Sequence, residues 1–148
     1  VMKHFHHEVR IEAPVEHVWA FFLDTSHWQE WMSDRKTTFN GPLDQVGTTY
    51  VQSMKVMGFE TKWTTEIVEV EQKRLIRMHS DYGPMDNTYR FEPSGEATSF
   101  LFDSDYEIPG KMPGFLKDLM SSGAMEKNQQ RIWESFNALA EANVPTQA

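Results

Sequence analysis

The sequence has 148 residues, a formal net charge of −8 at pH 7 and no cysteine. Its length suits a single domain, residues 1–148, with a sizeable core. No cluster of Lys and Arg interrupts the negative charge, which argues against binding to nucleic acid or to an anionic membrane surface. The lack of cysteine excludes disulfides and thiolate chemistry. The apolar runs are too short for a membrane span or a signal peptide, so we expect a soluble, cytoplasmic protein.

The composition is rich in large apolar side chains. Aromatic residues make up 13% of the chain, with 10 Phe and 5 Trp, and there are 9 Met. Aromatic rings carry much apolar area, and the unbranched Met side chain adapts to irregular surfaces. This mixture is typical both of a pocket that accepts varied apolar guests and of a well-filled core, so the composition alone leaves both interpretations open.

The N-terminal residues 3–12 alternate between apolar and polar side chains, which predicts a half-buried strand. His4 and His6 project from the same side of this strand. We expect them to be exposed or edge histidines, because no third ligand lies nearby and zinc sites use three or four.

Two short helices are predicted after this strand. Pro14 suits the first turn of a helix that runs to about Leu23, and residues 24–26 offer caps for a second helix. The apolar side chains of these helices are Val15, Val18, Trp19, Phe22, Trp28 and Trp31. His17 and His27 lie on the same helices, where we expect surface or capping histidines.

Six further segments have the pattern of strands, separated by turn residues such as Gly and Pro. They cover residues 37–40, 48–57, 59–71, 74–82, 87–92 and 98–108. The turn after the fifth of these is placed at residues 93–95. The predicted order is thus strand, two short helices, six strands and a final helix.

The final segment, residues 111–142, has apolar side chains at steps of three and four, as in an amphipathic helix. Its charged residues, including Glu126, fall largely on the opposite face. The face formed by Leu116, Leu119 and Met120 points away from the face of Met125, Ile132, Phe136 and Leu139. We therefore predict a lid-like segment over residues 113–120, a break at Ser121–Gly123, and a long helix from about Ala124.

Several of these features resemble the START-related superfamily of polyketide cyclases, dehydratases and lipid-transfer proteins, whose fold pollen allergens share. The resemblance rests on Ile11, Ala13, Pro14, Val18, Trp19, Asp24, Trp28, Trp31, Gly47, Tyr89 and Phe91. It implies an α+β helix-grip fold, with a seven-stranded antiparallel sheet wrapped around a long C-terminal helix. It also implies a ligand cavity between sheet and helix, but it does not by itself specify an activity.

The alternation along each strand predicts which side chains face that cavity. The expected ligand-binding residues are Tyr50, Gln52, Met54, Trp63, Met78, Tyr89, Phe91, Phe100, Phe102, Tyr106, Leu116, Met120, Met125, Gln129 and Ile132. Val56, Thr65, Ile67, Ile76, Asn87 and Ser104 share the same inner faces. The outward set is Arg77, His79, Arg90 and Asp103. The expected inner surface is aromatic, with neutral polar groups and no charged ones.

Signals for catalysis are weaker than those for binding. We find no nucleophile elbow, phosphate loop, zinc-ligand spacing or paired inward carboxylates. Asp81, Asp86, Asp103 and Asp105 are interpreted as solvated charges. The candidates for acid–base work are Tyr89 and Tyr106, together with His79 if a bulge turns it inward.

Three functions remain open from the sequence. We favour a binding or transport protein for a small hydrophobic ligand (lipid, polyketide-like or aromatic), without metal or cofactor, present as a monomer or homodimer. One alternative is a cofactor-independent enzyme of the polyketide cyclase or dehydratase type. The other is an interaction module like the Hsp90 activators, which would have a filled core and a functional outer surface.

Overall fold

The computed structural model describes residues 2–56, 58–107, 114 and 123–143. Its strands form one antiparallel sheet in the order β1-β7-β6-β5-β4-β3-β2. They are β1 (Lys3–Ile11), β2 (Lys36–Phe39), β3 (Thr49–Val56), β4 (Phe59–Glu71), β5 (Leu75–Ser80), β6 (Met85–Ser94) and β7 (Ala97–Tyr106). The helices are α1 (Val15–Leu23), η1 (Thr25–His27), α2 (Trp28–Trp31) and α4 (Ala124–Ala142). The predicted helix-grip fold, with short helices after the first strand, is confirmed.

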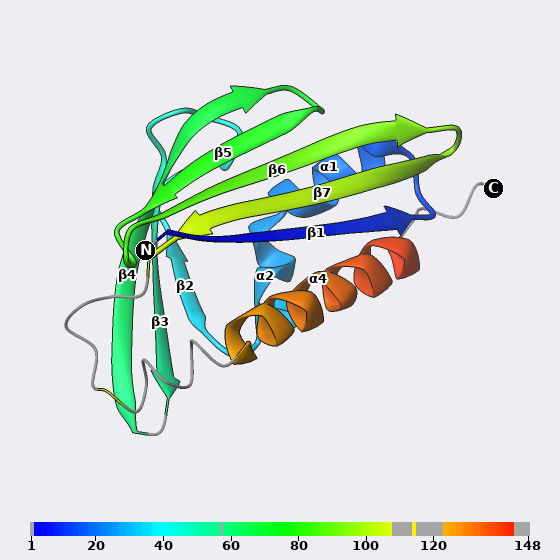
Figure 1. Cartoon of the computed structure of the whole chain (residues 1–148). Helices are drawn as coiled ribbons and strands as arrows, with labels where there is room; N and C mark the ends of the chain where they lie inside the picture. Colours follow the sequence, from blue (N-terminus) through cyan, green and yellow to red (C-terminus); the bar gives the residue numbers. More distant parts are fainter. Residues whose placement is uncertain (1, 57, 108–113, 115–122, 144–148) are drawn as a thin grey trace.

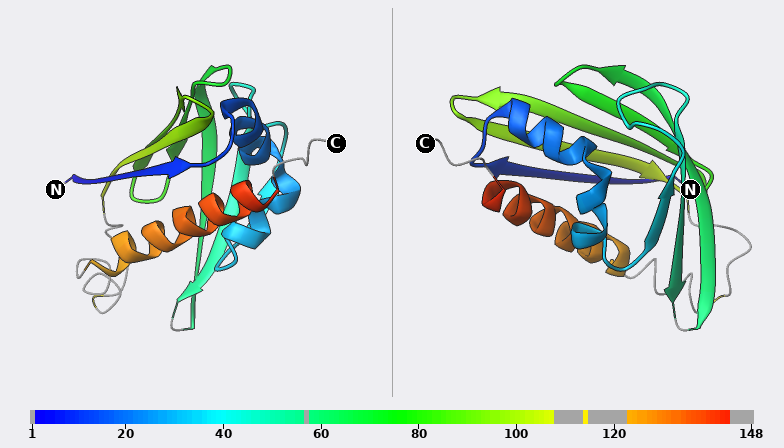
Figure 2. Two further views of the ribbon diagram at one scale, coloured as in Figure 1. Left: turned by 90° about the vertical axis from the view of Figure 1, so that its right-hand side faces the viewer. Right: turned by 180° about the vertical axis from the view of Figure 1, so that it is seen from behind.

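The sheet is strongly bent. Strands β3 and β4 run steeply across the direction of β6, β7 and β1, so the sheet curves around α4 (Figure 1). Helices α1 and α2 lie on the same side of the sheet as α4 and complete a layer of helices (Figure 2). A register shift between Ile67 and Glu69 marks an irregularity in the pairing of β4 with β5, and such bulges increase local twist. No described helix is both long and apolar enough to cross a membrane.

The core is built from aromatic rings that meet between the helices and the sheet. Phe22 of α1 has no exposed surface. Its ring centroid lies 5.0 Å from that of Tyr89, 5.5 Å from that of Phe91 and 5.9 Å from that of Phe136. One side chain thereby joins α1, β6 and α4, which fixes the position of the long helix over the sheet.

The hairpin between β6 and β7 differs from the prediction. We expected a turn at residues 93–95, but Pro93 and Ser94 continue β6 and pair with Thr98 and Ala97. The proline is tolerated because β5 begins at Leu75, so this end of β6 has an open edge on the β5 side. A missing N–H there removes no ladder hydrogen bond.

The start of α4 agrees with the predicted break. Gly123 precedes the helix with φ 89°, a left-handed conformation that glycine adopts without steric cost. A regular helix cannot pass through such a residue, and α4 begins at Ala124. The lid-like segment predicted over residues 113–120 lies outside the described residues, apart from Gly114.

Candidate functional site

Most of the side chains predicted to face inward are buried. Those with almost no exposed surface are Tyr50, Gln52, Trp63, Met78, Tyr89, Phe91, Phe100, Phe102, Tyr106 and Ile132. Met54 and Gln129 are half-buried. Leu116, Met120 and the side chain of Met125 lie outside the described part of the chain. The predicted outward residues Arg77, His79 and Arg90 are exposed.

Part of this concave face is filled by the protein itself. Phe91 lies 5.0 Å from Trp19 of α1, and Phe100 lies 5.2 Å from Phe136 of α4, measured between ring centroids. These phenylalanines therefore pack against helices. A group of hydrogen-bonded polar side chains lies instead on β2, β3 and β4, where Thr37, Gln52 and Trp63 meet.

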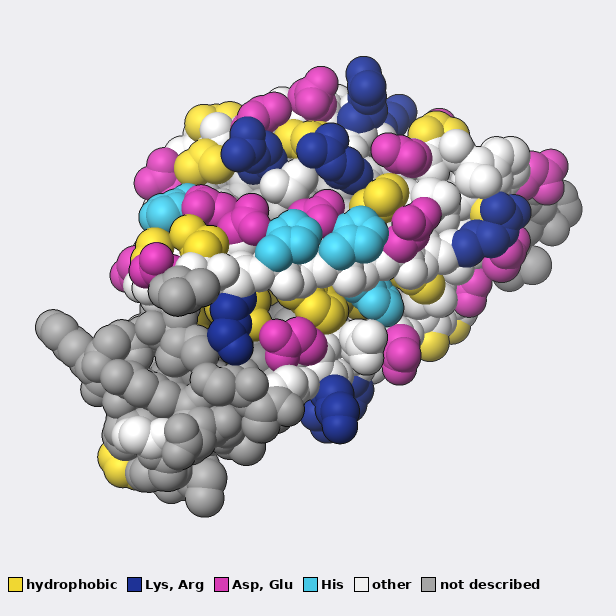
Figure 3. Space-filling model, viewed as in Figure 1, with side chains coloured by type: hydrophobic (Ala, Val, Ile, Leu, Met, Phe, Trp, Pro, Cys, Tyr) yellow, Lys and Arg dark blue, Asp and Glu magenta, His cyan; other side chains and the backbone are white. Residues whose placement is uncertain are grey.

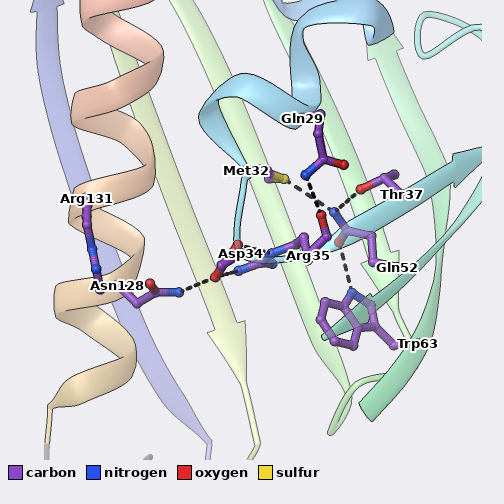
Figure 4. Close-up of polar contacts among 9 residues, drawn as sticks. All are labelled: Gln29, Met32, Asp34, Arg35, Thr37, Gln52, Trp63, Asn128 and Arg131. Atoms are coloured by element: carbon purple, nitrogen blue, oxygen red, sulfur yellow. Dashed lines mark hydrogen bonds and ion pairs between the residues drawn. The ribbon is translucent and has the colours of Figure 1, made fainter. Parts of the chain in front are cut away.

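A polar network surrounds Arg35, which directly precedes β2 (Figure 4). The carboxylate of Asp34 accepts hydrogen bonds from Arg35 Nε at 2.9 Å and Nη2 at 3.1 Å. The Asn128 amide of α4 donates to Asp34 Oδ2 at 3.0 Å. The Arg35 side chain is only 9% exposed, against 33% for Asp34. We call Asp34, Arg35 and Asn128 the Arg35 cluster.

The guanidinium of Arg35 lies over the predicted inner face. Its Cζ atom is 5.5 Å from the ring centroid of Trp63, within range of a cation–π interaction. Trp63 Nε1 donates to Gln52 Oε1 at 3.0 Å, and Gln52 Nε2 donates to Thr37 Oγ1 at 3.1 Å. The residues beside Arg35 are thus held in place by hydrogen bonds.

The expectation of an inner surface without charged groups is wrong at Arg35. This residue lies in the turn between α2 and β2, where neither the helical nor the strand period assigns a direction to a side chain. Alternation could place Trp63 and Gln52 inward, but nothing in the sequence indicated that an arginine would lie over them.

Glu126 is a second inward charge that the sequence analysis missed. The hydroxyl of Tyr106, at the end of β7, donates to Glu126 Oε1 at 2.8 Å. The other carboxylate oxygen, Oε2, is buried and has no hydrogen-bond partner in the described part of the chain. The helical period placed Glu126 on the polar face, but it lies in the first turn of α4, next to Tyr106. A buried carboxylate oxygen without a partner is costly, and a donor on a ligand would satisfy it.

The buried tyrosines are poor bases in this setting. Burial raises the pKa of Tyr50, Tyr89 and Tyr106 above the usual value for a phenol. All three are therefore protonated at neutral pH and can donate hydrogen bonds. Tyr50 donates to the sulfur of Met78 at 3.1 Å. A catalytic role of Tyr89 and Tyr106 stays a prediction. Because burial keeps both hydroxyls protonated, they could act only as donors of a hydrogen bond or a proton.

His79 is exposed, so the inward orientation required for catalysis does not occur. Its Nδ1 lies 2.7 Å from Asp86 Oδ1 on the outer face. The residue without a pairing partner at the irregularity is Val68 of β4, and burial still alternates along β5 from Ile76 to Ser80. Histidine side chains lie beside acidic ones on the face shown in Figure 3. Among the described residues, no group of three or more metal-ligating side chains is arranged to hold a metal ion.

The other histidines lie at the surface or between helices. His4 and His6 each have Nδ1 2.7 Å from a carboxylate oxygen of β7, of Asp105 and Asp103 respectively. His17 Nε2 lies 2.8 Å from the carbonyl oxygen of Ala140. His17 thereby ties α1 to the last turn of α4, which agrees with the expected capping role.

Solved structures of other proteins share this fold. The solved structures of TTHA0849 from Thermus thermophilus and of the Zhui aromatase/cyclase from Streptomyces are similar, with TM-scores of 0.77 and 0.78 and sequence identities of 20% and 19%. The first alignment covers 95% of this chain and 98% of the other, and the second covers 99% and 98%.

Norcoclaurine synthase from Thalictrum flavum, solved in complex with dopamine and hydroxybenzaldehyde, is also similar, with a TM-score of 0.70 and 16% identity over 99% of this chain and 90% of that chain. At these identities the similarity shows the fold alone. No curated protein matches the sequence. Residues 2–141 match the family described as polyketide cyclase / dehydrase and lipid transport, and this chain belongs to that family.

Proposed function

We propose that this protein binds a small hydrophobic ligand with an aromatic ring and an oxygen acceptor, between the sheet and the start of α4. The observation that carries the proposal is the orientation of Arg35. The carboxylate of Asp34 accepts hydrogen bonds from Nε and Nη2 of Arg35. The third nitrogen, Nη1, has no hydrogen-bond partner among the described residues. A nearly buried cation with a free donor, set against Trp63, suits an oxygen atom on an apolar molecule.

The surrounding side chains support a ligand of this kind. Trp63, Tyr50 and Met78 offer an apolar, mostly aromatic wall, which suits a flat ring. Arg35 would fix one end of the molecule, and the free oxygen of Glu126 would accept a hydrogen bond from a hydroxyl or amine elsewhere on it. A fatty-acid tail would contact the apolar wall but leave Arg35 and Glu126 without hydrogen-bond partners. We therefore favour an aromatic, oxygenated ligand over a simple lipid.

Replacing Arg35 by Met tests the binding function. Met keeps an unbranched apolar side chain but removes the donor, so affinity for an oxygenated aromatic ligand should fall about tenfold or more, the usual value of a hydrogen bond to a charged group. The measurement is displacement of Nile red by a panel of naphthyl ketones and phenols, with native mass spectrometry for ligands that co-purify.

Arg77→Met is the matched control, because Arg77 is exposed and pairs with Glu69 on the outer face. It should leave the affinity unchanged. If the unaltered protein binds no member of the panel and carries no co-purified molecule, the proposed function is wrong. If Arg35→Met and Arg77→Met behave alike, the ligand does not contact Arg35.

Acid–base catalysis is a second candidate function, and the unpartnered oxygen of Glu126 favours it. A dehydration of a β-hydroxyketone needs a base for the α proton and a donor for the developing oxyanion. Glu126 Oε2 would take the proton, and Arg35 Nη1 would donate to the carbonyl oxygen. The hydroxyl would then leave as water, taking up the α proton that Glu126 had accepted.

Glu126→Gln tests the catalytic candidate. The amide keeps the shape and still accepts from Tyr106, but it cannot take up a proton. We expect turnover of a naphthyl β-hydroxyketone to fall at least about a hundredfold, since general acid–base catalysis contributes roughly 10²–10⁴-fold, while affinity changes little. Loss of water is followed by mass spectrometry. Glu134→Gln, an exposed change on the same helix, is the control. Equal rates in both variants would exclude Glu126 as the base.

The interaction-module alternative has less support. It requires a functional outer surface, whereas Arg35 Nη1 and Glu126 Oε2 on the inner side have no hydrogen-bond partner among residues 2–56, 58–107, 114 and 123–143. The description of the matched family names cyclases, dehydrases and lipid transport. The inner face is therefore where we place the function.

A further inference from the structure

We infer that Asp34 makes the site selective for a neutral oxygen acceptor, such as a ketone or a phenol, over a carboxylate. This inference rests on the proposed function and specifies the charge on the polar end of the ligand. Asp34 acts through Arg35, by cancelling the charge of the guanidinium that the ligand would meet, and it is therefore a specificity-determining residue.

The pairing of Asp34 with Arg35 occupies one whole edge of the guanidinium. The two bonds, at 2.9 Å and 3.1 Å, have the bidentate arrangement that is strongest for this pair of groups. The free edge at Nη1 still offers its N–H donors, but the cation already has an anion beside it. A ligand at Nη1 therefore meets donors that belong to a neutral pair.

Asp34 remains ionised at neutral pH. Its burial opposes ionisation, but the Arg35 guanidinium and the Asn128 amide outweigh this effect and hold the pKa of the Asp34 carboxyl below its usual range. Asn128 fixes the carboxylate from α4 at 3.0 Å. Arg131 Nη2 in turn donates to Asn128 Oδ1 at 3.1 Å, but the Arg131 side chain is exposed and adds little uncompensated charge.

The charges around the site then disfavour an anion. Asp34 balances the charge of Arg35 through two hydrogen bonds, and Asn128 holds the carboxylate of Asp34 in place from α4. A ligand carboxylate would lose its hydration and gain no net opposite charge, which is unfavourable in a buried setting. A ketone or phenol oxygen accepts the same hydrogen bond from Nη1 at a much smaller desolvation cost.

The experiment compares two probes with one ring system, naphthyl methyl ketone and naphthoate, by isothermal titration calorimetry at neutral pH. The unaltered protein should bind the ketone at least about tenfold more tightly. Asp34→Asn keeps a hydrogen-bond acceptor for Arg35 but removes the negative charge. It should raise the affinity for naphthoate by about tenfold or more, since an unscreened charge near a protein surface is worth at least this much.

The affinity for the ketone should change in Asp34→Asn by much less than the affinity for naphthoate, because a neutral oxygen responds only weakly to the lost charge. Asp105→Asn makes the same change in net charge on the exposed outer face and should alter neither affinity. Asp105→Asn therefore distinguishes an effect of the charge beside Arg35 from an effect of the protein's net charge of −8.

The possible results are distinguishable. If the unaltered protein binds both probes equally, or prefers naphthoate, the inference is overturned while the proposed binding function stands. The same holds if Asp34→Asn and Asp105→Asn shift naphthoate affinity alike. If neither probe binds, the inference falls together with this assignment of the ligand class. Should Asp34→Asn not fold, the preference of the unaltered protein decides the question.

Discussion

Replacing Phe136 by Ala should lower the free energy of unfolding by about 3–5 kcal/mol, the usual range for removal of a fully buried phenylalanine. Phe136 has no exposed surface. Its ring centroid lies 5.0 Å from that of Trp31, 5.2 Å from that of Phe100 and 5.7 Å from that of Phe21. The substitution removes contacts with α1, α2 and β7 at once and leaves a cavity where α4 meets the sheet.

Urea unfolding followed by circular dichroism measures this loss. Val46→Ala is a suitable control, because Val46 is 58% exposed and surface changes are usually worth no more than about 0.5 kcal/mol. A loss below about 1 kcal/mol for Phe136→Ala would mean that the helix is not anchored through this ring. Reduced cooperativity without a shift in midpoint would mean that α4 detaches while the sheet remains folded.

Gly83→Ala is expected to destabilise the protein by about 2–5 kcal/mol, from the sum of backbone strain and a steric clash. Gly83 lies between β5 and β6 with φ +112°, and a Cβ atom there would be 1.9 Å from the carbonyl oxygen of Glu107. The Glu107 N–H donates to the carbonyl of Pro84 at 3.0 Å. The turn and the end of β7 are therefore too close for any side chain to be inserted between them.

Gly47→Ala separates the two causes. Gly47 also has a positive φ, +95°, but a Cβ atom there would have no neighbour within 4 Å. The free energy of unfolding of Gly47→Ala should therefore fall only by the cost of backbone strain at a positive φ, about 1–2 kcal/mol. Thermal or urea unfolding of both variants gives the difference, which we attribute to the clash with Glu107. Similar losses at Gly83 and Gly47 would contradict the close approach.

The fold was predictable because its signals are periodic. Alternation in β3 and β7 assigned Tyr50, Gln52 and Phe102 to the concave side, and the structure buries all of them. The phase change along residues 111–142 placed the helix start correctly at Ala124, since Gly123 is left-handed. These are features that a repeat of two or of 3.6 residues can report.

The charged part of the site was not predictable in this way. Arg35 lies in a turn, and its direction depends on the adjacent Asp34 and on Trp63 and Asn128, which come from distant parts of the chain. Glu126 lies on the helix face that periodicity marks as polar, and it points inward only because Tyr106 ends β7 beside the first helical turn. Tertiary contacts decide both orientations, and no local pattern reports them.

The bonds that fix Arg35 affect how tightly a ligand is held. A free arginine side chain has many rotamers, and ordering it on binding costs up to about 2 kcal/mol. Here Asp34 and the ring of Trp63 already restrict the guanidinium before any ligand arrives. The entropic cost is therefore met during folding, and a ligand of the proposed kind, even with a modest contact area, would gain nearly the full strength of its bond to Nη1.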